Sequence, residues 1–486
     1  MTTNVVVAVA LGCSGCAQLF GIDTTSGNGI DAPGPGVHAT IQRVSIGATT
    51  VTTAFDQAQT MDTLTFLDPD GTGGYRKVPG TVISTGSWQA DLATGNPVVD
   101  FTLFGGRHLW AFPTRDLHVA TAQLEHPNAE APAPAAQLVT SVAVPAVTTG
   151  DSFQIMAVGA WAVHDLTGME APAMSATTVA ISIPYASFAP MAPAPAIKRI
   201  VPDDQVLLLR HNGTTLTGVF QTSFDQTDSN MLTGTMANVT QDGTLDANVN
   251  PSQLQTRYAA VRPAVSGLAM SWSLNAAPGF TQLVNAGPGL ASGSIAVATT
   301  KISASYGNPF TSLGWNELLT YATSESRVVT LPTGEMLTLS AAANTYTAPS
   351  PNMTLDLPAG LPQTISIDQT PLSSDNMAVS LDPTKYAHVT IVADHPTNTV
   401  YQASLYEVLS TSPTTAQIKF VVEALTSDPQ AMFLPPDAFQ AGHTYTIAAG
   451  TFQGGYPNAM LGDLATTTPP FNQAYTFSGV FTVMNP

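Results

Sequence analysis

The sequence predicts an all-β protein in which tandem β-sandwich domains follow an apolar N-terminal leader and a flexible tether. Short runs rich in Thr, Val, Ile and Phe recur along most of the 486 residues, and Gly and Pro interrupt them as turns interrupt strands. Hydrophobic residues form 44% of the chain, so a sizeable core can be buried. Because strands do not alternate with helical patterns, the sequence argues against an α/β fold.

The charge composition narrows the classes of partner. The chain has 33 Asp+Glu but only 14 Lys+Arg, which gives a formal net charge of -19. A chain so poor in basic residues cannot neutralise a phosphate backbone, so we expect no nucleic acid partner. No run of about 18 uninterrupted apolar residues occurs, which excludes a helical protein that spans a membrane several times.

Residues 1–16 read MTTNVVVAVALGCSGC, with an apolar run from Val5 to Leu11 followed by small residues. This order is typical of the hydrophobic region and cleavage zone of a secretory signal, and the run is too short to span a bilayer. No Lys or Arg precedes Arg43, whereas a signal begins with positive charge. We therefore expect the true start codon to lie upstream of Met1, with a lack of export as the alternative.

Both cysteines of the chain, Cys13 and Cys16, lie in this leader. Ala17 stands where a c-type haem motif needs a histidine, and an apolar leader is not the strand-to-helix context of a thioredoxin motif. Residues 14–16 (SGC) instead resemble the end of a bacterial lipoprotein signal, and residues 16–23 (CAQLFGID) resemble the mature start of many envelope lipoproteins. The resemblance implies lipidation at Cys16, with Cys13 as the competing site, and Ala17 favours the outer membrane.

A flexible tether is predicted at 17–37, where Gly, Pro, Ser, Thr and Asp dominate. Such a spacer holds folded domains clear of a lipid surface. Because both cysteines precede the tether, the domains beyond it contain no disulfide and must be held together by the burial of their cores.

The segment 38–122 is predicted to be the first β-sandwich. Its opening alternates apolar and polar side chains at period two, as a half-buried strand does. Residues 68–71 (DPDG) place turn-forming side chains between two further strands. This turn and the strand GSWQA at 86–90 resemble the carboxypeptidase-regulatory or transthyretin-like β-sandwich. The resemblance implies a fold and no activity.

The segment 135–348 is predicted to be a large β domain, either a sandwich or a barrel. Breaks rich in Pro and Ala at 126–136 and 188–196 separate its strand-like runs, and turn clusters such as HNG at 211–213 stand at hairpin spacing. The segment 316–326 (NELLTYATSES) is the only helix that we expect, and its length is marginal.

The segment 350–486 is predicted to be a further β-sandwich, because runs such as AHVTIVA and VYQASLYEV have strand patterns. The piece Phe439-x-x-Gly442-x-x-Tyr445-x-Ile447 resembles the tyrosine corner of fibronectin type III and immunoglobulin-like domains. The resemblance implies a structural role for Tyr445, whose buried hydroxyl would bond to nearby backbone and fix a strand crossing.

The common short motifs of catalysis and nucleotide binding are absent from the chain. Neither H-E-x-x-H, a P-loop, G-x-G-x-x-G nor G-x-S-x-G occurs. We therefore assign no catalytic residue. Glycosidases and lyases stay open, because their carboxylates have no short sequence signature.

Two acidic turns are the features of the sequence that most suggest a bound cofactor. Ca²⁺ prefers oxygen ligands, and these turns make five residues candidates to bind it: Asp68, Asp70, Asp225, Asp228 and Asn230. Neither turn matches an EF-hand loop, and Asp and Gly also favour turns for conformational reasons. Two groupings of His and Asp, namely Asp116 with His118 and the pair Asp394-His395 after His388, offer at most two ligands each, so we assign no firm metal site.

The five tryptophans are candidates for a glycan-binding platform, because flat rings stack on sugar faces. Most of them lie inside strand patterns, so we predict instead that they are buried in the core. They are Trp88, Trp110, Trp161, Trp272 and Trp315.

Together these observations predict a non-catalytic, lipid-anchored protein of the bacterial envelope that acts as a structural or adhesive module. It would lie in the outer membrane, at the surface or facing the periplasm, and bind a protein or polysaccharide through loops or sheet edges. Because lysine is scarce, strand edges are poorly guarded, and self-association as a homo-oligomer or fibre is a variant of this hypothesis. The alternative is a secreted carbohydrate-active or peptide-acting β-fold enzyme with two facing carboxylates in one cleft.

Overall fold

The computed structural model describes most of the chain beyond the tether. The described residues are 36–48, 51–54, 64–70, 74–92, 98–103, 106–111, 114–123, 130–191, 197–227, 229–261, 268–278, 287–357, 359–395, 400–429, 432–464 and 468–484. The leader, the two lipidation candidates Cys13 and Cys16, and nearly all of the tether lie outside them, as does Asp228.

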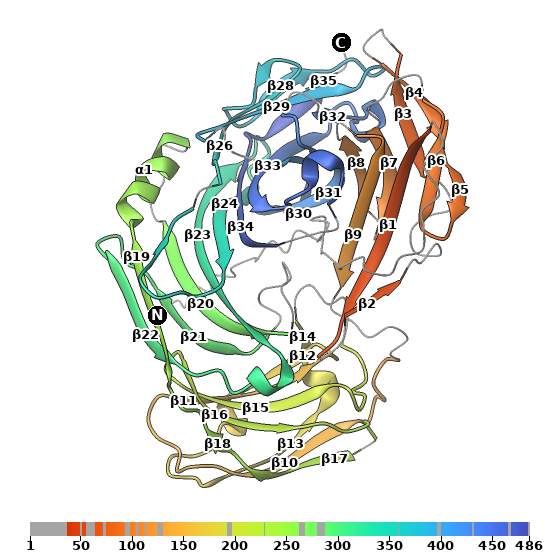
Figure 1. Cartoon of the computed structure of the whole chain (residues 1–486). Helices are drawn as coiled ribbons and strands as arrows, with labels where there is room; N and C mark the ends of the chain where they lie inside the picture. The colour runs from red at the N-terminus through yellow and green to blue at the C-terminus, as the bar shows by residue number, and fades with distance from the viewer. Residues whose placement is uncertain are drawn as a thin grey trace.

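Strands dominate the described residues, so the all-β prediction is confirmed (Figure 1). They form five hydrogen-bonded sheets, and the described part of the chain has one α-helix, α1 (Pro251–Val261). Single 3₁₀ turns lie at Gly168–Glu170, Tyr185–Ser187, Thr311–Leu313, Pro436–Ala438 and Ala459–Leu461. No helix among the described residues is long and apolar enough to cross a membrane.

Four of the sheets are small. The five-stranded sheet comprises β1 (Val37–Ile46), β2 (Val51–Ala54), β5 (Thr81–Ser84), β6 (Ser87–Ala90) and β9 (Asp116–Gln123). Two three-stranded sheets comprise β10 (Gln137–Ala143), β13 (Thr178–Pro184) and β17 (Ser229–Thr235), and β19 (Gly243–Val249), β22 (Lys301–Tyr306) and β25 (Met353–Leu355). The four-stranded sheet comprises β26 (Pro362–Ile367), β27 (Thr370–Pro371), β29 (Ala387–Ala393) and β32 (Met432–Leu434).

The fifth and largest sheet runs through the whole molecule. Its strands from the first half of the chain are β3 (Thr65–Pro69), β4 (Tyr75–Pro79), β7 (Val98–Leu103), β8 (Gly106–Ala111), β11 (Asp151–Val158), β12 (Ala162–Leu166), β14 (Ala189–Pro190), β15 (Gln205–Asn212), β16 (Thr215–Thr222) and β18 (Ala237–Asn238). Its strands from the second half are β20 (Ala269–Ala277), β21 (Gly289–Ser294), β23 (Asn316–Thr330), β24 (Met336–Thr347), β28 (Met377–Ser380), β30 (Val400–Ser412), β31 (Thr415–Thr426), β33 (Thr444–Gly455), β34 (Thr468–Phe477) and β35 (Phe481–Met484).

The largest sheet joins the first and last segments of the described chain. Residues Arg107–Ala111 of β8 pair in parallel with Val422–Thr426 of β31. The segment 38–122 therefore forms one sheet of its own and contributes four further strands, β3, β4, β7 and β8, to the sheet that it shares with 350–486. The hydrogen bonding thus crosses the boundaries expected from the sequence.

Two hydrophobic cores lie on opposite faces of this shared part of the sheet. Trp110 packs with Trp88 in the core under the five-stranded sheet, whereas its neighbour Leu109 packs with Val389 in the core under the four-stranded sheet. Successive residues of a strand point to opposite faces, so β8 serves both cores. The result is three stacked layers of sheet, which is sandwich packing on both faces of a common sheet.

A second stack occupies the middle of the chain, drawn at the bottom of Figure 1. The sheet of β13, β10 and β17 packs on β11 and β15 through a core that includes Leu138, Ile183 and Leu208. The neighbouring residues Leu207 and Leu209 point the other way, into a larger core that β20, β23 and α1 also line. This region is therefore built from packed sheets.

The helix expected at 316–326 is wrong. These residues form the first part of β23, which pairs antiparallel with β20 on one side and β24 on the other. Tyr321, Thr323 and Glu325 alternate as buried residues along it. Pairing on both edges satisfies the backbone groups of the segment, and this outweighs the helical preference of its Asn-Glu-Leu-Leu start.

The helix that does form, α1, was missed. Asn250 caps it, because its side-chain oxygen accepts the backbone N–H of Gln253 at 3.3 Å, and Pro251 opens it. Leu254 and Tyr258, four residues apart, are buried on one face. An Asn-Pro start is a recognised helix signal that the sequence contains.

Tyr445, at the start of β33, is buried, and its hydroxyl accepts the backbone N–H of Gln440 at 2.9 Å. Its ring packs edge-on against Phe439. The hydrogen bond ties β33 to the loop that leads into it, which is the structural role proposed for Tyr445 from the sequence.

Candidate functional site

The first acidic turn is held by protein groups rather than arranged around an open centre. Oδ2 of Asp68 lies 2.7 Å from Nη2 of Arg76, and Oδ1 of Asp70 accepts the N–H of Gly74 at 3.0 Å. The guanidinium charge of Arg76 opposes the approach of a cation to Asp68. The turn therefore closes the β3–β4 hairpin.

The second acidic turn is similar. Oδ1 of Asp225 lies 2.6 Å from Nη2 of Arg199, and Oδ1 of Asn230 accepts the N–H of Thr227 at 2.8 Å. Asp228 lies outside the described residues. The donors proposed for Ca²⁺ at this turn thus already hold an arginine and the turn's own backbone.

The His and Asp groupings do not converge either. Oδ1 of Asp116 lies 3.0 Å from Nδ1 of His38 rather than beside His118. Asp394 bonds through both oxygens to Arg257 of α1, at 2.7 and 3.1 Å. Within the described ranges no group of three or more His, Cys, Asp or Glu side chains is arranged to hold a metal ion.

The prediction that the tryptophans are core residues is confirmed. All five are at most 8% exposed, so none presents a ring to a sugar: Trp88, Trp110, Trp161, Trp272 and Trp315. Any aromatic platform on this molecule must be built from tyrosine, phenylalanine or histidine.

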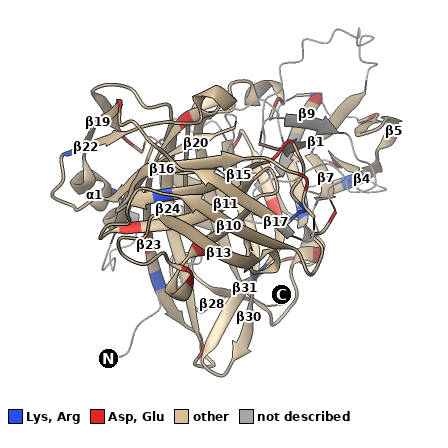
Figure 2. Ribbon diagram, turned by 90° about the horizontal axis from the view of Figure 1, so that it is seen from below, with Lys and Arg blue, Asp and Glu red and all other residues tan. Residues whose placement is uncertain are grey.

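Charged residues are sparse along the strands, as Figure 2 shows, and arginines form ion pairs with aspartates. Seven such ion pairs occur among the described residues: Arg76–Asp68, Arg107–Asp100, Arg107–Asp437, Arg199–Asp225, Arg210–Asp151, Arg257–Asp394 and Arg327–Asp375. Each of these carboxylates is therefore engaged by an arginine of the chain.

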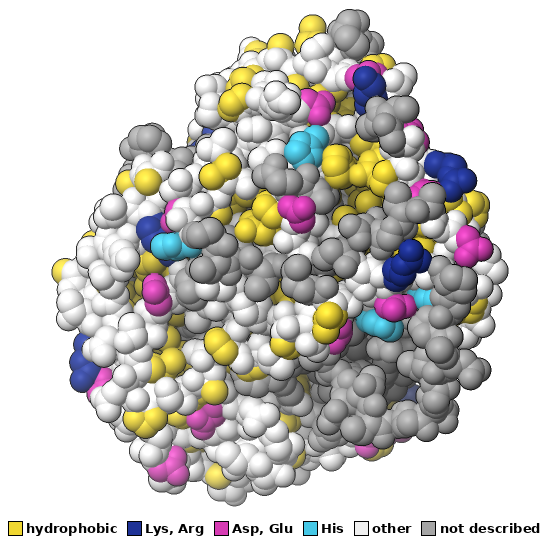
Figure 3. All heavy atoms as spheres, turned by 45° about the horizontal axis from the view of Figure 1, so that its top comes forward, with side chains coloured by type: hydrophobic (Ala, Val, Ile, Leu, Met, Phe, Trp, Pro, Cys, Tyr) yellow, Lys and Arg dark blue, Asp and Glu magenta, His cyan; other side chains and the backbone are white. Residues whose placement is uncertain are grey.

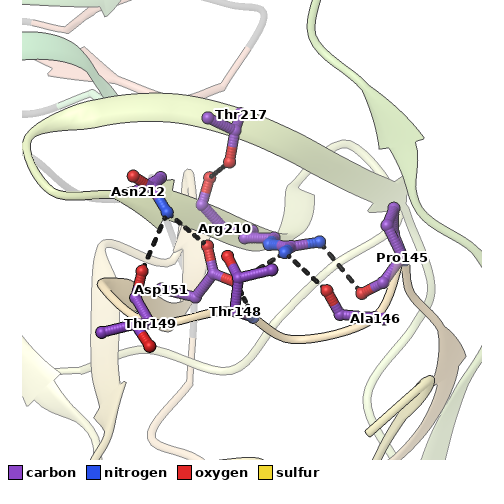
Figure 4. Close-up of polar contacts among 8 residues, drawn as sticks. All are labelled: Pro145, Ala146, Thr148, Thr149, Asp151, Arg210, Asn212 and Thr217. Atoms are coloured by element: carbon purple, nitrogen blue, oxygen red, sulfur yellow. Dashed lines mark hydrogen bonds and ion pairs between the residues drawn. The ribbon is translucent and has the colours of Figure 1, made fainter. Parts of the chain in front are cut away.

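The most elaborate of these pairs joins β15 to the start of β11 and to the loop before it (Figure 4). Nη2 of Arg210 lies 2.5 Å from Oδ2 of Asp151, and the guanidinium also donates to the carbonyls of Pro145 and Ala146 at 3.0 and 3.1 Å. Asn212 donates to the other oxygen of Asp151 at 3.1 Å. Both charged side chains are almost fully buried, so this group of hydrogen bonds around Arg210 and Asp151, here called the Arg210 hub, has a structural role.

The Arg210 hub displaces the pKa of Asp151. Burial alone would raise this pKa, but hydrogen bonds from Arg210, Thr148 and Asn212 outweigh burial and lower it well below its ordinary value. Asp151 therefore stays ionised over the whole physiological range.

A second buried polar group crosses three strands of the largest sheet. Nδ1 of His108 on β8 lies 3.3 Å from Oε1 of Glu423 on β31, and the other oxygen of Glu423 accepts from Gln402 of β30. Ser404, two residues along β30, lies 3.5 Å from the same oxygen. All four side chains are buried, so a substrate in solution would not reach them.

One aromatic cluster, in contrast, is half-buried at the surface. The aromatic patch comprises Tyr75 of β4, Tyr386, His388 of β29 and Phe433 of β32. The ring of Tyr75 lies 4.9 Å from that of Tyr386 and 5.5 Å from that of Phe433, both edge-on. The rings of His388 and Phe433 lie 5.1 Å apart with a tilt of 35°. Figure 3 brings this end of the molecule forward and shows hydrophobic side chains gathered beside a histidine.

Charged groups lie next to the aromatic patch. Arg107 binds both oxygens of Asp100, at 2.9 and 2.7 Å, and its Nη1 lies 2.7 Å from Oδ1 of Asp437, whose side chain is 60% exposed. The hydroxyl of Tyr386 is buried and makes no hydrogen bond to a described residue. Burial and the charge of Asp100 raise the pKa of Tyr386 to about 12, so the hydroxyl keeps its proton.

Sequence reasoning missed this patch, because its members come from three separate places in the chain. Tyr75 belongs to the segment 38–122, whereas His388 and Phe433 belong to 350–486, and the packing of the four-stranded sheet on the shared sheet brings them together. No spacing along the chain predicts that neighbourhood. The alternation of Ala387–Ala393, which places His388 on the outer face of β29, is the one signal that the sequence holds.

The two cavities found among the described residues are too small to hold a substrate. One, lined by residues that include Glu325, Arg327 and Phe477, measures about 10 Å³. Another, lined by residues that include Asp382, Lys385 and Phe439, measures about 20 Å³. Each has room for about one water molecule.

The chain matches no family model and no curated protein. One similar solved structure, Escherichia coli alpha-2-macroglobulin activated by porcine elastase, has 9% sequence identity and a TM-score of 0.14. The comparison covers 93% of this chain and 44% of that one, so the chain spans less than half the length of that protein. A likeness of this size carries no argument about fold or function.

Proposed function

We propose that this chain is a non-catalytic binding module of the bacterial cell envelope, held in the outer membrane by lipid on Cys16. The observation that carries the non-catalytic part is the pairing of its charged groups. The carboxylates of Asp68, Asp100, Asp225 and Asp394 each bind an arginine, which leaves them poorly placed to act on a substrate.

The displaced pKa values support the same proposal. Hydrogen bonds lower the pKa of Glu335, chiefly from Thr333, and that of Asp382, chiefly from Thr384. A general acid of the glycosidase type needs a raised pKa, which burial in an apolar pocket produces. Among the described residues, the carboxyl groups whose pKa is shifted, Asp151, Glu335 and Asp382, all have it lowered rather than raised.

The architecture suits a rigid display scaffold. Sheets packed face to face place loops and outer sheet faces at the surface, where binding residues are usually found. On this proposal the C-terminal layers form a fibronectin type III- or immunoglobulin-like sandwich, and the hydrogen bond of Tyr445 supports that assignment. The five-stranded sheet would correspond to the transthyretin-like part.

The anchor is tested by exchanging each cysteine in turn in the natural gene, expressed in its own host. Cys16→Ser should abolish incorporation of labelled palmitate and release the protein from the membrane fraction. The matched variant, Cys13→Ser, should keep both the label and the membrane association. Label in Cys16→Ser, or none in the unaltered protein, would contradict the proposal.

A further inference from the structure

We infer that the aromatic patch binds a neutral polysaccharide, whose sugar rings lie against Tyr75, Tyr386 and Phe433 and whose hydroxyls bond to Arg107 and Asp437. The inference rests on the proposed binding role but is independent of the lipid anchor. It names the chemical class of partner and the residues that would recognise it.

The rings have the form that a sugar needs. The faces of a pyranose carry C–H groups that pack on the flat faces of aromatic rings, so a site requires rings that are fixed yet partly exposed. Tyr75 is held edge-on by both Tyr386 and Phe433, and Tyr75 and Tyr386 pack inward against the core beneath the four-stranded sheet. Each of the three residues is only half-buried.

The polar groups beside the rings suit sugar hydroxyls. Asp437 has a largely exposed carboxylate, and Arg107, which binds it, is partly exposed as well. A carboxylate accepts hydrogen bonds and a guanidinium donates them, and sugars present both donors and acceptors. The Tyr386 hydroxyl, buried without a partner among the described residues, lies close enough to feel the charges of Asp100 and Asp437.

The charge balance favours a neutral glycan over an acidic one. Asp100 and Asp437 provide two negative charges against the single positive charge of Arg107. The whole chain is strongly acidic, with a formal net charge of -19. A polyanion such as a uronic acid polymer would therefore be repelled, whereas an uncharged hexose polymer would not.

The test measures binding of cellohexaose and maltohexaose to the purified folded chain by titration calorimetry, with hexagalacturonate as the acidic counterpart. At least one neutral hexasaccharide should bind, and hexagalacturonate should not. Phe433→Ala should weaken binding by more than tenfold. Asp437→Asn, at an exposed position that leaves the core intact, should weaken it about tenfold, which corresponds to roughly 1.4 kcal/mol.

Tyr346→Ala is the matched control, because Tyr346 is also half-buried but stacks on Phe471 beside the other core. It should leave binding unchanged, and thermal unfolding of each variant shows that it is folded. Failure of both neutral sugars to bind would overturn the inference, as would equal binding by the unaltered chain and Asp437→Asn, or preferential binding of hexagalacturonate. None of those results would affect palmitate labelling at Cys16. The labelling experiment therefore tests the anchor proposal independently of the sugar-binding inference.

Discussion

His108 on β8 and Glu423 on β31 lie directly opposite each other in a parallel strand pair, with Nδ1 and Oε1 3.3 Å apart, although 315 residues separate them in the chain. Both side chains are at most 4% exposed. The pair therefore belongs to the seam at which the first and last segments of the described chain become one sheet. Because the pair is buried at this seam, removing either side chain should destabilise the sheet.

Glu423→Ala should destabilise the whole fold. It leaves His108, Gln402 and Ser404 without their common acceptor in a buried site, and we expect the free energy of unfolding to fall by about 3 kcal/mol. The measurement is urea denaturation followed by circular dichroism. Glu407→Ala is the control, because Glu407 pairs with an exposed histidine, His443, and should change stability by less than about 1 kcal/mol. Equal losses in the two variants would contradict this account of the seam.

Asp151→Asn should change how stability depends on pH. The folded pKa of Asp151 is lowered, so its contribution to stability is present above the unfolded pKa of about 4 and is lost as the pH falls through the folded value. The unaltered chain should therefore lose more stability between pH 5 and pH 3, taken as round values spanning the acid titration range of Asp, than the variant does. The denaturant midpoint at each pH gives the comparison. Asp225→Asn, at an exposed pair, should behave like the unaltered chain.

Two Tyr→Phe substitutions test whether the hydroxyl of Tyr445 fixes its strand. Tyr445→Phe removes the acceptor of the Gln440 N–H and should lower the free energy of unfolding by about 1 kcal/mol. Tyr321→Phe removes an equally buried hydroxyl that bonds to no described residue, and it should leave stability unchanged or slightly higher. Thermal unfolding of the two variants side by side decides the matter. A larger loss for Tyr321→Phe would refute the role given to Tyr445.

Self-association, if it occurs, should depend on the edge of the five-stranded sheet. Ile83 on β5 is 50% exposed, and within the described strands β5 pairs only with β6, so its other edge is open. Ile83→Lys should slow concentration-dependent assembly measured by light scattering. Val392→Lys is matched in exposure, at 51%, but lies on β29, which is paired on both sides, and should have no such effect. Equal slowing by both variants would show that an added charge anywhere on the surface slows assembly, and would contradict a role for this edge.

Local patterns predicted most of the strands but not their partners. The period-two alternation near Val37 and the turn residues before Tyr75 indicate β1, β3 and β4, because burial and turn chemistry act on neighbouring residues. Segment 316–326 shows the limit, since pairing with β20 and β24 overrides its local preference for helix. Partners 315 residues apart, such as His108 and Glu423, leave no signal in a single sequence.

The candidate site was beyond sequence reasoning for the same reason. The tryptophans, the obvious aromatic candidates, were correctly placed in the core, because large apolar rings in strand patterns are usually buried. The tyrosines and phenylalanine of the aromatic patch come from β4, β32 and the residue before β29, and only the packing of the four-stranded sheet on the shared sheet gathers them.

The central claim, that this is a lipid-anchored envelope protein, is tested most directly by the mass of its N-terminal peptide. The protein is extracted from the membranes of its host, digested with a protease, and the N-terminal peptide is analysed by mass spectrometry. The account predicts a peptide that begins at Cys16 and carries two or three acyl chains. An unmodified N-terminal peptide on protein recovered from the soluble fraction would contradict it.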